Sequence, residues 1–363
     1  MSGRGGEERW GDAETGRPGD AATEERWGEG GKGRREEGTE RPRRGSASNA
    51  SPRRTSLAPA DKVVVAYLVI ITALIAIFSY RIQAWPWLCA AQVIGIGFVV
   101  LISWLDVAAA SPSPPIAHSP RLTVPASRLA TFIHGWYPVA LIPITFKELS
   151  YLIPRIHPRD FDAALAAIDY RVFGMHPTVW LERLTWPPIT ELFQLCYPTY
   201  YFLPIILGAV IWRSGNSERY RFWVFVVAFG FYLSYLGYIA VPAIGPRFLP
   251  EILAAQTNPL TGLLFFQTVR DTLDRAEGLT RDCFPSGHTE MTLLALYYAR
   301  RFHRKTFRFF LPLGTAIILS TVYLRYHYVV DVVAGGLLAG VVILSARRIF
   351  GALGGDDRVA LDM

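Results

Sequence analysis

Long apolar runs recur along the chain from residue 63 onward. Five uncharged runs are close to the ~20 residues that a helix needs to cross a bilayer core. They cover residues 63–80, 82–105, 129–146, 192–212 and 222–246, and shorter runs follow at 309–324 and 332–346. A further helix is expected over 285–299, although it contains His288 and Glu290. The pattern predicts an all-α integral membrane protein with about eight transmembrane helices.

The positions of the basic residues support this count. Arginines and one lysine precede the first run, five basic residues lie within 300–308, and Arg347 and Arg348 follow the last run. Cytoplasmic loops of membrane proteins are enriched in Lys and Arg. With the helix over 285–299 included, all of these clusters lie on one side. We therefore expect a multi-pass protein of the cell membrane with both termini in the cytoplasm.

Composition divides the chain into segments. Residues 1–60 hold 12 basic residues, 11 acidic residues and 12 glycines, and they are too polar to bury a core. The sequence predicts five parts: a disordered cytoplasmic tail (1–60), a transmembrane hairpin (61–106), a Pro/Ser linker (107–127), a six-helix catalytic domain (128–350) and a C-terminal tail (351–363).

The bulk composition excludes several classes of protein. Three cysteines in 363 residues cannot form a disulfide framework. The net charge of +7 comes from short basic clusters between apolar runs, which argues against a nucleic-acid partner. The histidines other than His288 and His327 are scattered along the chain, so no metal centre or cofactor is expected. We interpret His134 as a satisfied buried histidine. We interpret Cys283 as a structural residue.

Three polar motifs stand at helix ends that the topology places together on the outer face. They are Gly-Pro-Arg at 245–247, Cys-Phe-Pro-Ser-Gly-His at 283–288 and Arg-Tyr-His-Tyr-Val-Val-Asp at 325–331. Ionisable groups at membrane depth are costly and therefore mark functional sites. The sequence predicts an active site where these motifs meet.

The spacing of His327 and Asp331 puts them on one face of a helix, one turn apart. A carboxylate there can hold one ring nitrogen and leave the other as a nucleophile. For this pair alone, a histidine at a helix start that is satisfied by a nearby carboxylate is the commoner arrangement.

Candidate phosphate ligands lie in the other motifs. The backbone N–H groups of Ser286 and Gly287 at a helix start predict an anion site, with His288 beside it as a general acid. Arg247 and Arg325 offer guanidinium groups for phosphate oxygens. Simple helix capping and interfacial snorkelling are the structural alternatives. Together the motifs fit phosphoryl transfer through a phosphohistidine.

These motifs resemble the type 2 phosphatidic acid phosphatase and haloperoxidase superfamily. Its Pro-Ser-Gly-His motif is matched at 285–288. In its Ser-Arg-x5-His-x3-Asp motif, Ser320, His327 and Asp331 fit, but Thr321 stands at the arginine position. Its Lys-x6-Arg-Pro motif is not found in that form.

One branch of this superfamily fits further residues. The Gly-Pro-Arg motif and the His-Tyr-x2-Asp pattern look like the branch of inositol phosphorylceramide synthase. The stretch at 169–174 and the tyrosines of the fourth helix are also similar to bacterial relatives of that branch.

The resemblance implies a six-helix core, His327 as nucleophile, His288 as acid and Asp331 as the orienting carboxylate. It implies a lipid phosphate or phospholipid substrate and no cofactor. Transfer of a phosphoinositol-type head group to a lipid alcohol is the first interpretation. Hydrolysis of phosphatidic acid or a polyprenyl diphosphate is the alternative, and a non-enzymatic membrane scaffold is a third.

Overall fold

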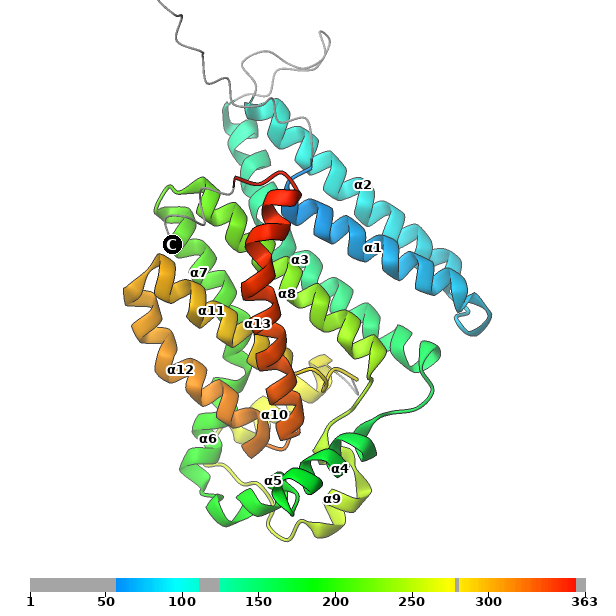
Figure 1. Cartoon of the computed structure of the whole chain (residues 1–363), viewed down its shortest axis with the longest axis vertical. Coiled ribbons are helices and arrows are strands. Elements are labelled where there is room, and N and C mark those ends of the chain that lie inside the picture. Colours follow the sequence, from blue (N-terminus) through cyan, green and yellow to red (C-terminus); the bar gives the residue numbers. More distant parts are fainter. Residues whose placement is uncertain (1–56, 111–123, 278–280, 357–363) are drawn as a thin grey trace, which may run out of the picture. The chain divides into compact units, whose positions relative to one another are not determined.

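The computed structural model describes residues 57–110, 124–277 and 281–356. Within these ranges every regular element is helical, as the apolar pattern predicts (Figure 1). The predicted disordered tail lies, up to residue 56, outside the described residues, and so does most of the predicted Pro/Ser linker.

Seven helices in the described part of the chain are long and apolar enough to cross a membrane. Six are continuous: α1 (Pro59–Ile77), α2 (Trp85–Ala110), α3 (Val124–Ile156), α8 (Ser217–Ala240), α12 (Arg304–Tyr323) and α13 (Val329–Ala352). The seventh is the segment Pro187–Arg213. The eighth expected helix is α11 (Gly287–Phe302), which has only 16 residues. It is shorter than the ~20 residues of a typical span, and it packs against α12 and α13.

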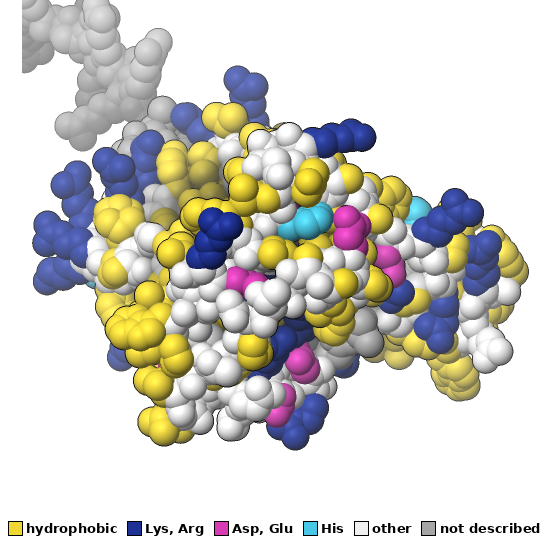
Figure 2. Space-filling view, turned by 90° about the horizontal axis from the view of Figure 1, so that it is seen from below, with side chains coloured by type: hydrophobic (Ala, Val, Ile, Leu, Met, Phe, Trp, Pro, Cys, Tyr) yellow, Lys and Arg dark blue, Asp and Glu magenta, His cyan; other side chains and the backbone are white. Residues whose placement is uncertain are grey.

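Apolar side chains cover the outside of these helices as well as the interior. On α13, Leu337 is 69% exposed and Leu344 is 80% exposed, while Val342 of the same helix is fully buried. Such large apolar surfaces are expected where a protein meets lipid. Figure 2 looks onto the end of the molecule that carries the short helices, where acidic and basic side chains stand among the apolar ones.

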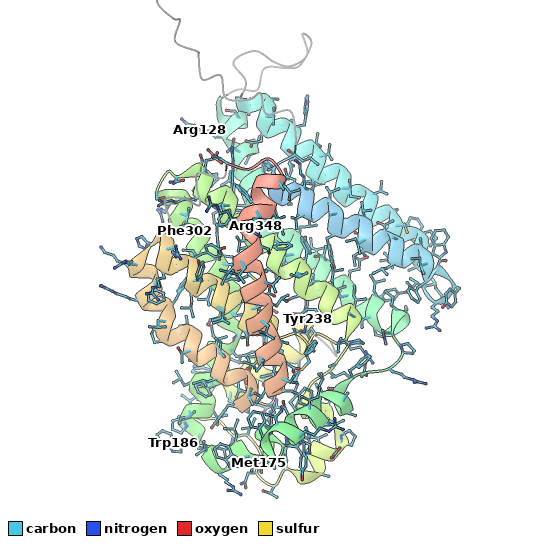
Figure 3. The ribbon with its side chains drawn as sticks, viewed as in Figure 1. Arg128, Met175, Trp186, Tyr238, Phe302 and Arg348 are labelled. Atoms are coloured by element: carbon cyan, nitrogen blue, oxygen red, sulfur yellow. The ribbon has the colours of Figure 1, made fainter. Side chains whose placement is uncertain are left out.

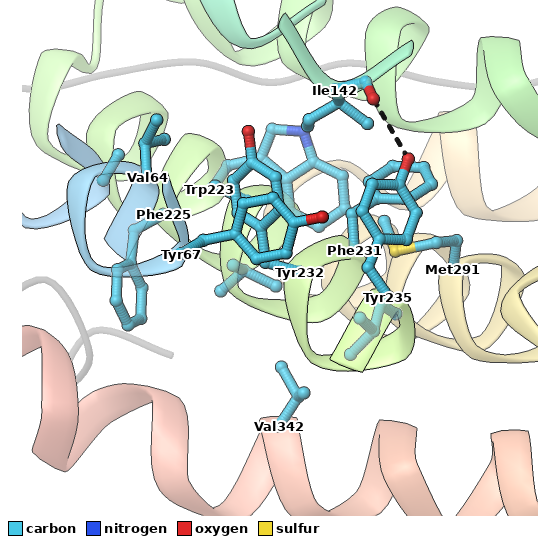
Figure 4. Close-up of a cluster of buried hydrophobic side chains, with 14 of the residues drawn as sticks. Val64, Tyr67, Ile142, Trp223, Phe225, Phe231, Tyr232, Tyr235, Met291 and Val342 are labelled. Carbon is cyan, nitrogen blue, oxygen red and sulfur yellow. Dashed lines mark hydrogen bonds between the residues drawn. The ribbon is translucent and has the colours of Figure 1, made fainter. Parts of the chain in front are cut away.

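The N-terminal hairpin packs directly on the other long helices. Helices α1 and α2 join through a short turn of 3-10 helix (Ser79–Arg81), and α1 lies against α8. Tyr67 of α1 stacks on Tyr232 of α8 with ring centroids 4.1 Å apart. Next to this pair, Tyr235 donates a hydrogen bond to the carbonyl of Ile142 (Figure 4). Buried aromatic pairs of this kind contribute roughly 0.5–1.5 kcal/mol beyond their area.

The fourth expected span is interrupted near its start. It consists of α6 (Pro187–Cys196), a 3-10 turn (Tyr197–Tyr201) and α7 (Phe202–Arg213). Pro198 has no N–H and cannot continue the hydrogen-bond pattern of α6. The tighter turn directs Tyr197 and Tyr200 into the protein, where both are buried.

Short helices close one end of the bundle, which we call the site end. They are α4 (Asp162–Phe173), α5 (Pro177–Trp180), α9 (Pro250–Ala255) and α10 (Phe266–Glu277), with 3-10 turns at Leu181–Leu184 and Pro246–Phe248 (Figure 1). Trp180 and Trp186 are both exposed here, and Figure 3 labels Trp186 at this end.

Candidate active site

The three polar motifs meet at the site end. The N–H of Cys283 donates to the carbonyl of Ala243 at 3.1 Å, and the N–H of Ser286 donates to the carbonyl of Asp331 at 3.1 Å. Gly245 has φ 110°, and a Cβ there would stand 2.5 Å from the carbonyl oxygen of Tyr326. Only glycine permits this close approach. The chain therefore brings together the segments that carry His288, His327 and Arg247.

A backbone carbonyl orients His327. Its Nδ1 lies 2.8 Å from the carbonyl oxygen of Cys283 and 3.6 Å from Oδ2 of Asp331. A carbonyl can only accept, so Nδ1 carries a proton, and in the neutral ring the lone pair is on Nε2. The nearer acceptor is thus the Cys283 carbonyl, and the Asp331 carboxylate lies beyond normal hydrogen-bond length.

The carboxylate of Asp331 accepts its hydrogen bonds through a single oxygen. Oδ2 accepts from the N–H of Tyr328 at 2.8 Å and from the thiol of Cys283 at 2.7 Å. Burial, reinforced by the neighbouring carboxylate, raises the pKa of the Cys283 thiol well above its usual range, so the thiol remains a donor. Within the described residues, Oδ1 is buried and has no hydrogen-bond partner. Asp331 therefore caps the start of α13 and keeps one oxygen available.

His288 lies between two aromatic rings. Its ring centroid is 4.1 Å from that of Tyr197 and 3.8 Å from that of Tyr200. The ring of His327 is 5.5 Å away. Nε2 of His288 is buried and has no partner in the described part of the chain. Because a buried polar atom normally finds a partner, this nitrogen marks a place for a polar ligand.

The predicted anion-binding residues have other contacts as well. Ser286 donates its N–H to Asp331, and its hydroxyl accepts from the N–H of Thr289 at 3.3 Å. A Cβ on Gly287 would stand 2.3 Å from the hydroxyl of Tyr238, a residue labelled in Figure 3. Ser286 thus serves as the helix cap, and Gly287 allows close packing. Phosphate binding by either residue stays a prediction.

Arg247 reaches the rings around His288. Its guanidinium lies 4.5 Å from the ring centroid of Tyr326, and Tyr326 stacks on Tyr197 at 4.3 Å. Nη1 of Arg247 also binds Asp274 of α10 at 2.7 Å. The charge of Arg247 is therefore held at the end of a column of rings that leads to His288.

Arg325 has a different set of partners. Its guanidinium binds Glu182 at 3.0 Å, Gln256 at 2.8 Å and the carbonyl of Asn258 at 2.7 Å. The residue has φ 67°, which is uncommon outside glycine. Through these hydrogen bonds, Arg325 joins the loop after α9 to the turn after α5. Thr321 stands at the position of the family's arginine. Its backbone carbonyl oxygen accepts the N–H groups of Tyr326 and His327.

Two aspartates of α4 position the site without having been predicted. Asp162 accepts the N–H groups of Ile244 and Gly245, at 2.9 and 2.7 Å, and the hydroxyl of Tyr328 at 3.0 Å. Asp169 accepts the first N–H groups of α13, from Val329 at 2.8 Å and Val330 at 2.9 Å. Their spacing of seven residues places both carboxylates on one helix face. From this spacing alone, the sequence could have indicated that the two aspartates act on the same side of the helix.

One group of side chains could hold a metal ion by distance alone. The ligand atoms of Cys283, His327 and Asp331 lie within 4.8 Å of one another, and all three residues are buried. The carboxylate already accepts from the Cys283 thiol, and the His327 Nδ1–H already donates to a carbonyl. The group is therefore accounted for as a hydrogen-bonded cluster.

The family model described as the PAP2 superfamily matches residues 163–345, about half of the chain. The matched range includes the site motifs and all of α4 except its first residue, Asp162. A PA-phosphatase related-family protein of Dictyostelium discoideum is 27% identical over 164 residues. That match covers 40% of this chain and 30% of the relative, so the chain spans less than a third of its length. No solved structure matches the chain. The protein is thus a multi-pass membrane member of the PAP2 superfamily.

Proposed function

We propose that this protein cleaves a phosphate ester of a membrane lipid through a phosphohistidine formed at His327. The observation that carries the proposal is the hydrogen bond from Nδ1 of His327 to the carbonyl of Cys283 at 2.8 Å. It leaves the Nε2 lone pair for attack on phosphorus. The superfamily match and the phosphatase-related relative support this class of reaction.

The proposed chemistry has two steps. Nε2 of His327 forms a bond to phosphorus while the bond from phosphorus to the lipid oxygen breaks, and that oxygen takes a proton from His288. Water then attacks phosphorus, giving a proton to His288, and the phosphorus–nitrogen bond breaks. The unpartnered Nε2 of His288 supports its role as the acid and base.

Arg247 is the proposed phosphate ligand, and Ser286 and Gly287 are candidates from the sequence. Arg247 is favoured because its guanidinium lies over the ring column that ends at His288. A cation at this position would stabilise the charge on the phosphate oxygens in the transition state. Arg325 is less suited, since three protein groups already bind its guanidinium.

Transfer of a phosphoinositol-type head group to a lipid alcohol is the second candidate. One observation favours it: the exposed fraction is only 3% for His327, 6% for His288 and zero for Asp331. A closed site limits access of water to the phosphohistidine and so favours an alcohol as acceptor. We further propose that the site faces the outer side of the membrane. The basic clusters at the opposite helix ends support this orientation, because such clusters are typical of the cytoplasmic side.

Product analysis tests both candidates. Purified protein would be incubated with phosphatidic acid, or with a phospholipid and a lipid alcohol, beside a His327→Ala variant as control. Release of phosphate by wild type alone supports hydrolysis, and a new phosphorylated lipid supports transfer. Equal products from wild type and the variant would rule out His327 as nucleophile.

A further inference from the structure

An elongated apolar cavity runs beside the site between α3, α7 and α8. Its volume is about 470 Å³, within the range of roughly 300–1,000 Å³ found for ligand pockets. Its walls are almost entirely apolar or aromatic; representative lining residues are Val139, Phe146, Ile205, Val227 and Phe231. Figure 4 shows part of the floor, where Trp223, Phe231 and Tyr235 of α8 face Ile142 of α3. An apolar channel of this kind suits a hydrocarbon chain.

One end of the cavity adjoins the site. Tyr200 and Tyr201 line the cavity, and both rings contact the ring of His288. Tyr238 also lines it, and the Tyr238 hydroxyl is the group against which Gly287 packs. Lys147 stands at this same end, on α3. The cavity therefore begins where the phosphate of a substrate would lie, beside a cationic side chain.

The opposite end is closed by aromatic residues. Trp136 and Tyr220 line it with ring centroids 5.7 Å apart, and the Tyr220 hydroxyl donates to the carbonyl of Gly135 at 2.9 Å. Beyond Tyr220 lies a second cavity of about 210 Å³ lined by Asp61, Asp106 and His134. Charged groups there would oppose entry of a hydrocarbon chain.

The cavity extends beyond one half of a bilayer core, which measures about 15 Å. Lys147 and Gly135, at its two ends, are twelve residues apart on α3, which corresponds to about 18 Å at the rise of an α-helix. Tyr238 and Tyr220, at the same two ends, are eighteen residues apart on α8, which corresponds to about 27 Å. Val139 and Phe202 line the cavity and are 42% and 57% exposed, so it opens sideways toward the lipid.

We infer that this cavity binds one hydrocarbon chain of the lipid whose phosphate is cleaved, and that Tyr220 sets the longest chain that fits. The inference rests on the proposed function, because it places the lipid phosphate beside His288 and His327. It identifies the substrate class as a lipid phosphate whose chain is long enough to extend from the site beyond one half of the bilayer core.

A series of single-chain alkyl phosphates of increasing length, presented in detergent micelles, tests this inference through phosphate release. For wild type, kcat/KM should rise by up to about fourfold per added methylene and then level off. Gly208→Leu adds a side chain to the cavity wall and should make the plateau begin at a shorter chain, with at least a ~10-fold loss on the longest chains. Ile206→Phe adds bulk on the same helix outside the lining, where Ile206 is exposed, and should leave the profile unchanged.

Tyr220→Ala frees only the volume of the ring and should extend the rise by the few methylenes that fit there, up to the charged second cavity. Tyr220→Phe keeps the ring and should retain the wild-type limit. Hydrolysis whose length dependence is the same in wild type, Gly208→Leu and Tyr220→Ala would overturn the cavity assignment while leaving the proposed function standing. Equal loss on the shortest and longest chains in Gly208→Leu would also overturn it. If wild type releases no more phosphate than His327→Ala from any substrate, the proposed function fails, and this inference with it.

Discussion

Two histidine clusters lie at opposite ends of the helices, one partly buried and one buried, and they differ in how their ring nitrogens are used. At the end away from the site, Nδ1 of His134 contacts Asp106 at 2.9 Å and Nε2 contacts Asp61 at 3.0 Å. At the site end, His327 binds one carbonyl through Nδ1, and Nε2 of His288 has no partner within the described residues. Saturated partners characterise a structural histidine, and unused nitrogens characterise a reactive one.

The surroundings of the clusters follow the same division. His134 joins the N-terminal hairpin to α3, because Asp61 belongs to α1 and Asp106 to α2. Tyr137 adds a hydrogen bond to Asp61 at 2.9 Å. At the site, His288 instead lies between the rings of Tyr197 and Tyr200, which fix its plane without occupying Nε2.

The largest loss is expected for His327→Ala. Removing a nucleophile typically lowers kcat by ~10⁴-fold or more, since the attack on phosphorus is lost. The measurement is phosphate release from a lipid phosphate, together with trapping of an acid-labile phosphoryl group on the protein. His134→Ala is the matched control at the other cluster and should still form the phosphoenzyme. A labelled phosphoenzyme in His327→Ala would contradict the assignment.

His288→Gln should lower kcat by ~10²–10⁴-fold on a lipid phosphate, because a general acid is lost. The loss should be much smaller with a nitrophenyl phosphate, whose leaving group needs no proton. Comparing the two substrates separates proton donation from misfolding. If activity falls equally on both, His288 acts on the structure of the site and not as an acid.

The two arginines should differ in what their loss changes. Arg247→Ala should raise KM and lower kcat/KM by ~10-fold or more, since one charge-assisted contact to phosphate is worth about 1.5–3 kcal/mol. Arg325→Ala should mainly lower thermal stability, because it leaves Glu182 buried and unpaired, a loss of about 3–5 kcal/mol for such pairs. Steady-state kinetics and thermal unfolding of both variants test this. The reverse outcome would make Arg325 the phosphate ligand.

A smaller effect is expected at Asp169, which caps the start of α13. Asp169→Ala removes the acceptor for two backbone N–H groups and should destabilise the protein by about 1 kcal/mol. Because α13 carries Asp331, kcat should fall several-fold while KM stays close to wild type. Asp169→Asn retains an acceptor oxygen and should recover much of the loss. Failure of the Asn variant to recover would point to the charge itself.

The sequence predicted much of the fold because the apolar runs have the length of a bilayer span. It also predicted which motifs would lie together, since span parity and basic loops place their helix ends on one side. Ion-pair partners that are remote in the chain could not be predicted from the sequence. Arg325 and Glu182, for example, are 143 residues apart. The acceptor for His327 was missed for another reason, because a backbone carbonyl leaves no signature in side-chain identity. The break in the helix at Pro198 was not predicted, because it lies within a continuous apolar run.

The smallest effect on activity is expected for His134→Ala, although its effect on stability should be large. The variant leaves Asp61 and Asp106 facing a cavity without their shared donor, a loss of about 3 kcal/mol for a buried pair. Thermal unfolding should therefore begin at a lower temperature, while kcat/KM at a permissive temperature stays within about twofold of wild type.

A double-mutant cycle makes this last prediction specific to the cluster. His134→Ala combined with Asp61→Asn should destabilise by less than the sum of the single changes, because the second change removes the unpaired charge left by the first. The same cycle with Asp331→Asn should be additive, since that carboxylate lies in the other cluster. A fall in kcat/KM that matches His288→Gln would mean that the two ends of the molecule are coupled, and the division between a structural and a reactive histidine cluster would no longer hold.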